Sequence, residues 1–286
     1  MIDVALRILL HDRGKLVITL AGVAFAVTLV FVQVGLFRGL LANATATIER
    51  ANAEMWITSK NTPNVDFPHY FPDTLVQRVR SVPGVERADN LVVNFVGMQL
   101  PTGAEETVIV YGLEDPAAWN LPWAMTEGSP DLVRRGRTML LDESSVSRFG
   151  EFRVGDRREL FGQRIDIVGR TREAVSFTTM PMAFMSLRVA QELDPNINGR
   201  TAYILVKLAP GADAAEVGAE IKQRLPHNDV YTRQAWADRT RDYWIVSTGL
   251  GLNMALTVFL GSSSASRSWR RRSTRRRSTI RASSGR

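Results

Sequence analysis

The charge-free run Leu16–Phe37 constrains this chain more than any other feature. Its 22 residues include no Asp, Glu, Lys or Arg, and the polar members are Thr19, Thr28 and Gln33. At 1.5 Å per residue a helix of this length reaches roughly 33 Å, enough to cross a hydrocarbon core of about 30 Å. The run therefore predicts a first transmembrane helix at residues 16–37.

Two other interpretations of this run stay open. A secretory signal also begins with positive charge and an apolar run, and Ala42-Asn43-Ala44 resembles its cleavage box. The apolar region of a signal is usually about 7 to 15 residues long, however, and this one is longer. The helix could instead be buried in a soluble fold, where charge-free helices of this length are rare. The length favours the membrane anchor over both.

The residues before the run predict its orientation. Arg7, Arg13 and Lys15 precede it and are opposed by two aspartates. The positive-inside bias places this end of the chain in the cytoplasm. Apolar residues between positions 4 and 10 give the segment an apolar face. Residues 1–15 are therefore predicted to form an amphipathic helix along the cytoplasmic membrane surface.

A second apolar run begins near the other end of the chain. The 17 residues from Trp244 carry no charge, and Tyr243 and Trp244 fit the aromatic belt found at membrane interfaces. The run stops at Gly261, short of a comfortable spanning length. We therefore expect an incomplete second transmembrane helix at residues 244–261, with residues 38–243 forming a periplasmic domain between the two spans.

Residues 262–286 form a Ser- and Arg-rich tail that dominates the net charge. The chain carries +7, but the tail holds nine Arg and no acid, so the remainder has 27 basic and 29 acidic residues, a net of −2. The tail is either a cationic arm that binds nucleic acid or anionic lipid, or out-of-frame translation of GC-rich DNA. We favour the second, because an apolar helix is interrupted where the tail begins and the body has four Lys against 23 Arg. The chain is then expected to be truncated.

The body between the two runs mixes helix and strand signals. Residues 39–53 continue as a helical stalk, and Asn61–Pro72, with three prolines, is typical of a loop. Asp73–Val82 and Ala212–Leu225 show the apolar spacing of helices, and a polar helix is expected at Gln234–Asp242. Strands are expected at 54–58, 85–98, 106–113, 138–141, 164–169, 182–185, 202–208 and 230–232, with a short helix at 143–149. The pattern predicts an α+β extracytoplasmic domain inserted between transmembrane helices.

Side chains that carry chemistry are sparse. The chain has no Cys and no Walker A pattern, so neither a disulfide nor a P-loop for ATP is predicted. His11, His69 and His227 are far apart and lack the spacing of metal ligands. Ser144 and Ser145 lack a Gly-x-Ser-x-Gly context and are expected to cap a helix. We predict no catalytic, cofactor-binding or metal-binding residue.

Two sets of residues admit either a functional or a purely structural interpretation. The first is four glycines in the predicted spans: Gly35, Gly39, Gly249 and Gly251. They would let helices pack or dimerise closely, or they are scattered glycines in lipid-facing helices. The second is an apolar, aromatic cluster: Trp119, Trp123 and Met125. It is a docking surface for a periplasmic adaptor or, as we favour, part of the core.

These features together resemble the MacB/FtsX-like permeases of ABC exporters, and most closely the DevC-like branch, the heterocyst glycolipid exporters. The resemblance covers residues 1–261 and is carried by the order and spacing of short motifs. These are Leu6-Arg7, Gly35-Leu36-Phe37-Arg38-Gly39, Met55-Trp56 after the stalk, Val82-Pro83-Gly84-Val85, and Thr138 to Asp142.

The resemblance implies an export function in the bacterial inner (plasma) membrane. Such permeases have four transmembrane helices with the periplasmic domain between the first two, so this chain would lack the last two. They couple ATP hydrolysis by a partner subunit to extrusion of a lipid, glycolipid or similar amphiphile. The implied partners are an ABC ATPase subunit, a periplasmic membrane-fusion adaptor, an outer-membrane channel of the TolC type, membrane lipid and a second copy of the chain.

Two other functions remain alternatives. A membrane-anchored regulator or scaffold of the FtsX type would signal across the bilayer without moving cargo. The second alternative is a membrane protein that binds nucleic acid through its basic tail. Because only the tail supports that binding, no nucleic-acid partner is predicted.

Overall fold

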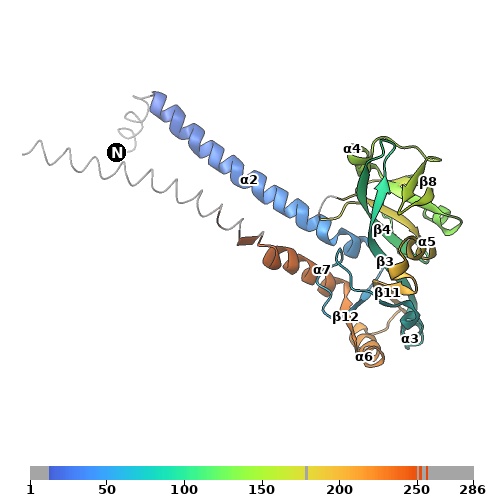
Figure 1. The fold of residues 1–286 in the computed structure, drawn as a ribbon. Helices are drawn as coiled ribbons and strands as arrows, with labels where there is room; N and C mark the ends of the chain where they lie inside the picture. Colours follow the sequence, from blue (N-terminus) through green and yellow to red (C-terminus); the bar gives the residue numbers. More distant parts are fainter. Residues whose placement is uncertain (1–12, 178–179, 250, 253–255, 257–286) are drawn as a thin grey trace, which may run out of the picture. The chain divides into compact units, whose positions relative to one another are not determined.

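The computed structural model describes residues 13–177, 180–249, 251, 252 and 256 (Figure 1). Contacts divide the chain into two units. One is Leu40–Tyr243, and the other combines Met1–Gly39 with Trp244–Arg286. Residues 1–12 of the predicted cytoplasmic helix, half of the residues of the second span and the whole tail lie outside the described residues, so those expectations stay predictions.

Helix α2 runs over 38 residues, Arg13–Arg50, without interruption. No proline occurs in it, so its backbone hydrogen bonds can continue from end to end. Within the described part of the chain it is the one helix long and apolar enough to cross a membrane. Large apolar side chains in its N-terminal part are exposed, for example Ile18 at 75% and Phe31 at 73%. The structure provides the helix, and its place in a bilayer remains a prediction.

One mixed sheet forms the centre of the unit Leu40–Tyr243. Its strand order is β12-β1-β11-β3-β4-β9-β6-β8-β5, and β7 pairs with β3 and β8. Its strands are β1 (Met55–Ser59), β3 (Val85–Gln99), β4 (Glu105–Leu113), β5 (Met125–Glu127), β6 (Thr138–Asp142), β7 (Arg157–Leu160), β8 (Gln163–Thr171), β9 (Met182–Ser186), β11 (Tyr203–Leu208) and β12 (Asn228–Thr232). A separate short pair joins β2 (Phe71–Pro72) to β10 (Arg200–Thr201). The β4–β9 and β6–β8 pairs are parallel, and the other pairs are antiparallel.

Short helices cover the sheet. They are α3 (Val76–Arg80), α4 (Val146–Phe149), α5 (Leu187–Leu193), α6 (Ala214–Arg224) and α7 (Arg233–Asp242), with 3-10 turns at Asp73–Leu75, Pro130–Arg134, Glu143–Ser145 and Pro195–Ile197 and a π-helical turn at Tyr243–Ser247. Ser186, Asp213 and Thr232 cap the starts of α5, α6 and α7 by accepting a backbone N–H with their side chains. Such caps satisfy N–H groups that a helix start leaves unpaired.

The first and last elements of the domain form a split βαβ arrangement. The segments β1-α3-β3 and β11-α6-β12 interleave in the sheet order β12-β1-β11-β3. Helices α3 and α6 share one core with the sheet, through Val79, Val217 and Ile221 against Ile57 and Ile204. This is the ferredoxin-like topology, and the chain between β3 and β11 is an insertion that widens the sheet.

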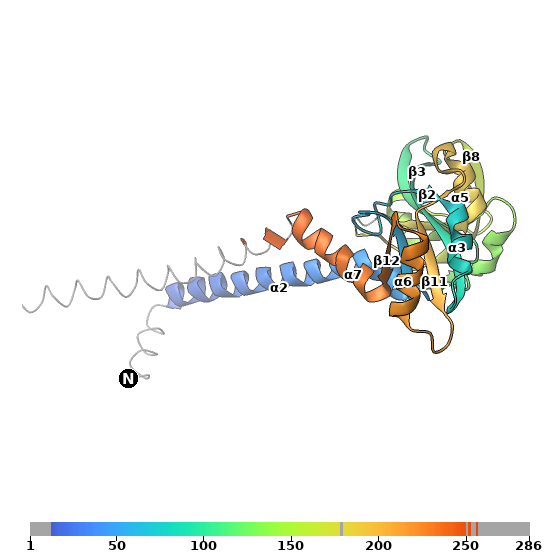
Figure 2. The same ribbon diagram turned by 90° about the horizontal axis from the view of Figure 1, so that it is seen from below.

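Alternate residues of the central strands enter two different cores. Leu91 of β3 packs in the core that includes Ile48 of α2 and Trp236 of α7, whereas its neighbour Val92 packs in the core that includes Val189 of α5. The period of two in a strand produces this division. The C-terminal end of α2, which we call its lower end, covers one face of the sheet together with α7. Helix α5 covers the other face (Figures 1 and 2).

The α+β class and the strands expected from the sequence are confirmed, with ends shifted by one or two residues. The stalk helix ends at Arg50 rather than at residue 53. Strands β2, β5, β7 and β10 and helix α5 were not predicted, because short edge elements lack a periodic pattern of their own. The loop expected at Asn61–Pro72 is confirmed up to Tyr70, since Phe71 and Pro72 form strand β2, and residues 64–66 of the loop are buried.

Candidate functional site: the base of the stalk

The lower end of α2 packs onto the domain through small and β-branched side chains. Ala44, Thr45, Thr47 and Ile48 are each at most 1% exposed. The Thr47 hydroxyl donates to the Tyr111 hydroxyl oxygen at 3.4 Å, a contact between α2 and β4. We call residues 44–50 of α2 together with α7 the stalk base.

Helix α7 is anchored by one large aromatic side chain. Trp236 is fully buried, and its ring stacks on Tyr231 with centroids 5.2 Å apart and lies 5.9 Å from the ring of Tyr203. Polar bonds fix both ends of the helix. Arg233 Nε donates to the Ala53 carbonyl at 2.8 Å, and Arg239 Nε donates to the Thr62 carbonyl at 3.2 Å. Buried aromatic area of this kind contributes most to holding such a helix in place.

An ion pair connects the two parts of the stalk base. Arg241 of α7 pairs with Glu49 of α2, and its other amino group binds Asp238 at 2.5 Å. The Arg241 and Glu49 side chains are 31% and 45% exposed. Exposed pairs contribute about 0.2–1 kcal/mol, so burial around Ile48 and Trp236 stabilises the stalk base more than this pair does.

The loop after β4 closes the C-terminal end of α2. The Asn52 N–H donates to the Trp119 carbonyl at 3.0 Å, and Asn120 Nδ2 donates to the Arg50 carbonyl at 2.9 Å. The Arg50 guanidinium lies 5.2 Å from the centroid of the Trp123 ring. These bonds satisfy groups that the end of a helix leaves without intrahelical partners. The end of the stalk is therefore tied to this loop as well as to the sheet.

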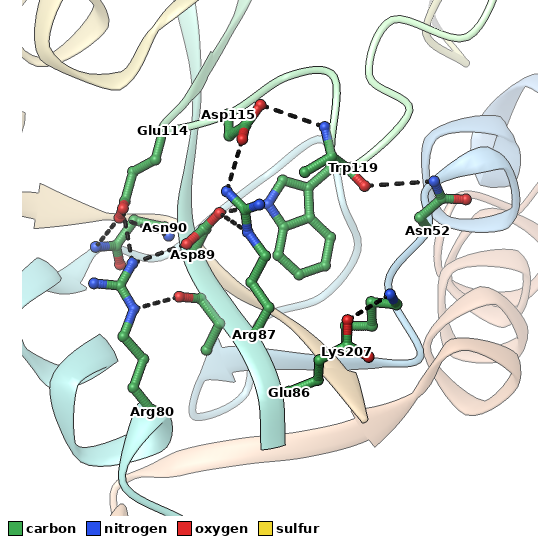
Figure 3. A network of polar contacts seen from close by, with 12 residues as sticks. Asn52, Arg80, Glu86, Arg87, Asp89, Asn90, Glu114, Asp115, Trp119 and Lys207 are labelled. Atoms are coloured by element: carbon green, nitrogen blue, oxygen red, sulfur yellow. Dashed lines mark hydrogen bonds and ion pairs between the residues drawn. The ribbon is translucent and has the colours of Figure 1, made fainter. Parts of the chain in front are cut away.

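A cluster of charged residues holds that loop against β3, as Figure 3 shows. At its centre Asp89 accepts from Arg80 Nη2 at 2.8 Å, from Arg87 Nε at 2.7 Å and from the Trp119 indole N–H at 2.8 Å. The carboxylate itself is only 6% exposed. Three charge-assisted bonds on one buried carboxylate are strong and directional. We call these four residues the Asp89 cluster.

Two further carboxylates complete the arrangement. Arg80 also donates to Glu114 at 2.7 Å, and Arg87 donates to Asp115 at 3.0 Å. Burial raises the pKa of Asp115, but the hydrogen bonds from Arg87 and the Ala118 N–H, with the nearby guanidinium charges, outweigh burial and hold this pKa below its ordinary value. Asp115 is therefore ionised at neutral pH. The Asp89 cluster connects β3 and α3 to the loop that closes the stalk.

A buried carboxyl group lies in the loop between β1 and β2. Asp66 is 3% exposed, and its Oδ2 has no hydrogen-bond partner among the described residues. Its neighbours are held in place, since the Tyr203 hydroxyl lies 3.0 Å from the carbonyl oxygens of both Asn64 and Val65. Burial raises the pKa of Asp66 from 3.8 to about 7. Asp66 also interacts electrostatically with Tyr111, the residue that Thr47 of the stalk base contacts.

The aromatic residues singled out from the sequence lie beside the stalk base. Trp119 is 1% exposed and belongs to the main core, so its ring offers no surface to a partner. Trp123 and Met125 are half-buried and pack against the same core. Trp123 meets Phe184 edge to face at 6.4 Å. Trp119 is therefore a core residue, and an adaptor contact at Trp123 and Met125 stays a prediction.

The four glycines are placed in the other unit. Apart from the adjoining backbone, no atom of the described residues lies within 4 Å of a Cβ built on Gly35, Gly39 or Gly249. Gly249 has a φ of +70°, a left-handed conformation that glycine adopts readily. A Cβ on Gly251 would come within 2.8 Å of the Ile245 carbonyl oxygen. Helix packing at these glycines stays a prediction.

The stalk base contains no group suited to chemical catalysis. Within the described ranges, no three His, Cys, Asp or Glu side chains come together as a metal-binding group. Sequence reasoning missed Ile48, Asp89 and Trp236 as residues that fix the stalk, and it missed the buried carboxyl group of Asp66. Only Trp236 left a signal, as the one large apolar residue in a polar helix. The arrangement attaches residues 44–50 of α2 to the sheet and to α7.

An α+β domain joined to a long apolar helix is the arrangement expected of an extracytoplasmic domain on a membrane anchor. The family model described as "MacB-like periplasmic core domain" matches residues 16–224. The chain therefore belongs to the MacB-like periplasmic core domain family, the periplasmic domain of MacB-type ABC exporter permeases. No curated protein matches the chain.

The chain is similar to three solved structures, and the first of them supports the fold. The periplasmic region of MacB from Actinobacillus actinomycetemcomitans is 9% identical, with a TM-score of 0.50 over 64% of this chain and 91% of that one. The extracellular domain of the noncanonic ABC-type transporter YknZ from Gram-positive bacteria is 12% identical, with a TM-score of 0.48 over 63% and 99%. A domain of a putative permease protein from Porphyromonas gingivalis is 15% identical, with a TM-score of 0.45 over 64% and 89%.

Proposed function

We propose that this chain is the permease subunit of an ABC-type exporter, in which α2 carries motion from the membrane to the periplasmic domain. The observation that supports this most directly is the buried stalk base. Helix α2 has 38 residues, roughly 57 Å at 1.5 Å per residue, and the Ile48 side chain near its C-terminal end is fully buried. A displacement of the helix cannot be absorbed at that joint without exposing core.

The proposed complex includes several partners. A cytoplasmic ABC ATPase supplies the ATP hydrolysis, because the family places that activity in another domain or subunit. A periplasmic membrane-fusion adaptor and an outer-membrane channel of the TolC type receive the cargo, and a second copy of the chain completes the permease. The chain resides in the inner membrane with residues 16–37 in contact with lipid.

The cargo we propose is a lipid, a glycolipid or a similar amphiphile. The support is the resemblance of the motifs between Leu6 and Asp142 to the DevC-like branch. In this mechanism the ATPase dimer closes on ATP, α2 moves, and the domain pushes the cargo toward the adaptor. The chain's own contribution is therefore positional, through the stalk base and the Asp89 cluster.

A kink placed just above the stalk base tests the proposal. Ala42 is exposed on α2, two residues before the buried Ala44. Ala42→Pro removes one helical hydrogen bond and bends the helix, at about 3 kcal/mol, without touching the domain core. Ala42→Ser is the matched control, since it keeps the helix. The measurement is ATP-dependent extrusion of a fluorescent glycolipid from vesicles that contain the chain extended to the four transmembrane helices that the resemblance implies, its ATPase and its adaptor.

We expect Ala42→Pro to abolish extrusion while the ATPase still assembles and hydrolyses ATP. Unchanged extrusion in Ala42→Pro would show that α2 does not carry the motion. If the chain instead co-purifies with a cell-wall hydrolase and no adaptor, it is a regulator of the FtsX type rather than an exporter.

A further inference from the structure

Strand β12 is the terminal strand of the sheet order, and among the described strands it pairs with β1 alone. The Arg233 N–H donates to the Glu54 carbonyl, toward β1. At the other end of the strand, the Asn228 N–H donates to Leu225 and the Asn228 carbonyl accepts from Lys222, both away from β1. Backbone groups alternate along an antiparallel strand, so the N–H and C=O of Val230 also point away from β1.

A groove runs beside this open edge. Its volume is about 390 Å³, and it is lined by Ala214, Ala215 and Gly218 of α6 and by Met55, Val230 and Thr232 of the sheet. A Cβ on Gly218 would come within 2.9 Å of Met55 Cε, so glycine lets α6 lie close to the sheet there. The small α6 residues leave room for side chains from an added strand.

The charges along the edge are balanced. Lys222 Nζ binds Asp229 at 3.2 Å, and the other Asp229 oxygen accepts the Asn61 N–H at 3.1 Å. Burial raises the pKa of Asp229, but these bonds outweigh burial and lower the pKa overall, so the carboxylate is ionised. Tyr231 donates to the same carboxylate at 3.5 Å.

We infer that β12 pairs antiparallel with β12 of a second copy, about a two-fold axis through Val230. This register sets Val230 opposite Val230, and Asp229 opposite Tyr231, so no like charges face each other. The two outward Val230 backbones exchange their N–H and C=O bonds, and the valine side chains enter the grooves. Lys222 occupies the Asn228 carbonyl and so ends the ladder at that residue. This inference deepens the homodimer proposed above and is independent of export.

Cross-linking tests the register directly, because the chain contains no Cys. A Val230→Cys variant of the full chain, in detergent micelles, should form a disulfide-linked dimer on mild oxidation, since facing residues of an antiparallel pair lie within disulfide reach. Gln223→Cys, at an exposed position of α6 outside the groove, is the control and should stay monomeric on a non-reducing gel. Light scattering reports the oligomeric state of the unmodified chain.

A dimeric chain in which Val230→Cys fails to cross-link would overturn the edge pairing and leave the proposed dimer standing. A monomeric chain would overturn both the edge pairing and the proposed dimer. Export is tested separately by the Ala42→Pro extrusion assay.

Proline at the same position provides a second measurement. Val230→Pro removes the outward N–H and no bond to β1, and proline is tolerated on sheet edges. We expect thermal unfolding to show a folded domain and light scattering to show loss of the dimer. Val230→Thr keeps the N–H and the β-branched shape, so it should remain dimeric. A dimer that survives Val230→Pro would contradict the inference.

Discussion

The two halves of helix α2 differ in which side chains they expose. Above Gly39 the large apolar residues are open, with Phe25 at 70% and Phe31 at 73%, whereas below it Thr45, Thr47 and Ile48 are at most 1% exposed. A helix in water would bury its phenylalanines and expose its threonines. The difference teaches that two environments act on one continuous helix: a protein core on the lower half and, as we propose, lipid on the upper half.

The largest effect should come from truncating the buried half. Ile48→Ala removes a fully buried side chain from the main core and should lower the free energy of unfolding by about 2–5 kcal/mol. Phe31→Ala, on the exposed half, should leave the free energy of unfolding unchanged. Urea unfolding in detergent, followed by tryptophan fluorescence, measures both. An equal loss of unfolding free energy in the two variants would contradict the proposed difference between the two halves.

The buried carboxyl near the stalk base predicts a pH dependence. The pKa of Asp66 rises from 3.8 to about 7 in the folded chain, so between these values the folded state binds more protons than the unfolded one. The free energy of unfolding should therefore fall as pH rises from 4 to 7, by at most about 4 kcal/mol at 1.36 kcal/mol per pKa unit, and the contribution of Asp66 should change little above that.

Asp66→Asn is the control for this dependence, because an amide cannot titrate. Its stability should be nearly flat over the same range, measured by urea unfolding at a series of pH values. Unchanged pH dependence in Asp66→Asn would mean that another group is responsible.

A charge in the exposed half tests whether lipid surrounds it. Phe25→Arg places a guanidinium near the middle of the predicted span and should oppose insertion by about 2.5–3.5 kcal/mol. Ala42→Arg, outside that span, should have no such effect. The fraction of chain that stays with membranes after carbonate extraction reports the difference. Equal retention of both variants would argue against a bilayer around residue 25.

The smallest effect concerns the polar contact between α2 and β4. Thr47→Val removes the donor to Tyr111 at 3.4 Å and should cost about 0.5–1.5 kcal/mol. Tyr111→Phe and the double variant complete a cycle that isolates the coupling between the two hydroxyls. A coupling indistinguishable from zero would show that the Thr47–Tyr111 bond adds nothing to the apolar burial and the other polar contacts of the lower half.

Much of the fold followed from local patterns. The apolar period of 3.6 in Ala212–Leu225 and the alternation in Arg164–Gly169 predicted α6 and β8 because each pattern reports one buried face. The stalk base did not follow in the same way. The lower half of α2 is rich in Ala and Thr, which carry no strong signal of burial. The surfaces that bury this half come from β4 and α7, far along the chain.

Sequence by itself determined that this chain carries a long uncharged helix, an α+β body and no recognisable catalytic motif, because each of these depends on residues close together in the chain. Tertiary structure alone decided that Asp66 and Asp89 are buried, that Trp119 faces the core, and that β12 ends the sheet. Those outcomes depend on which distant segments meet, since burial and strand pairing are set by neighbours in space rather than by neighbours in sequence.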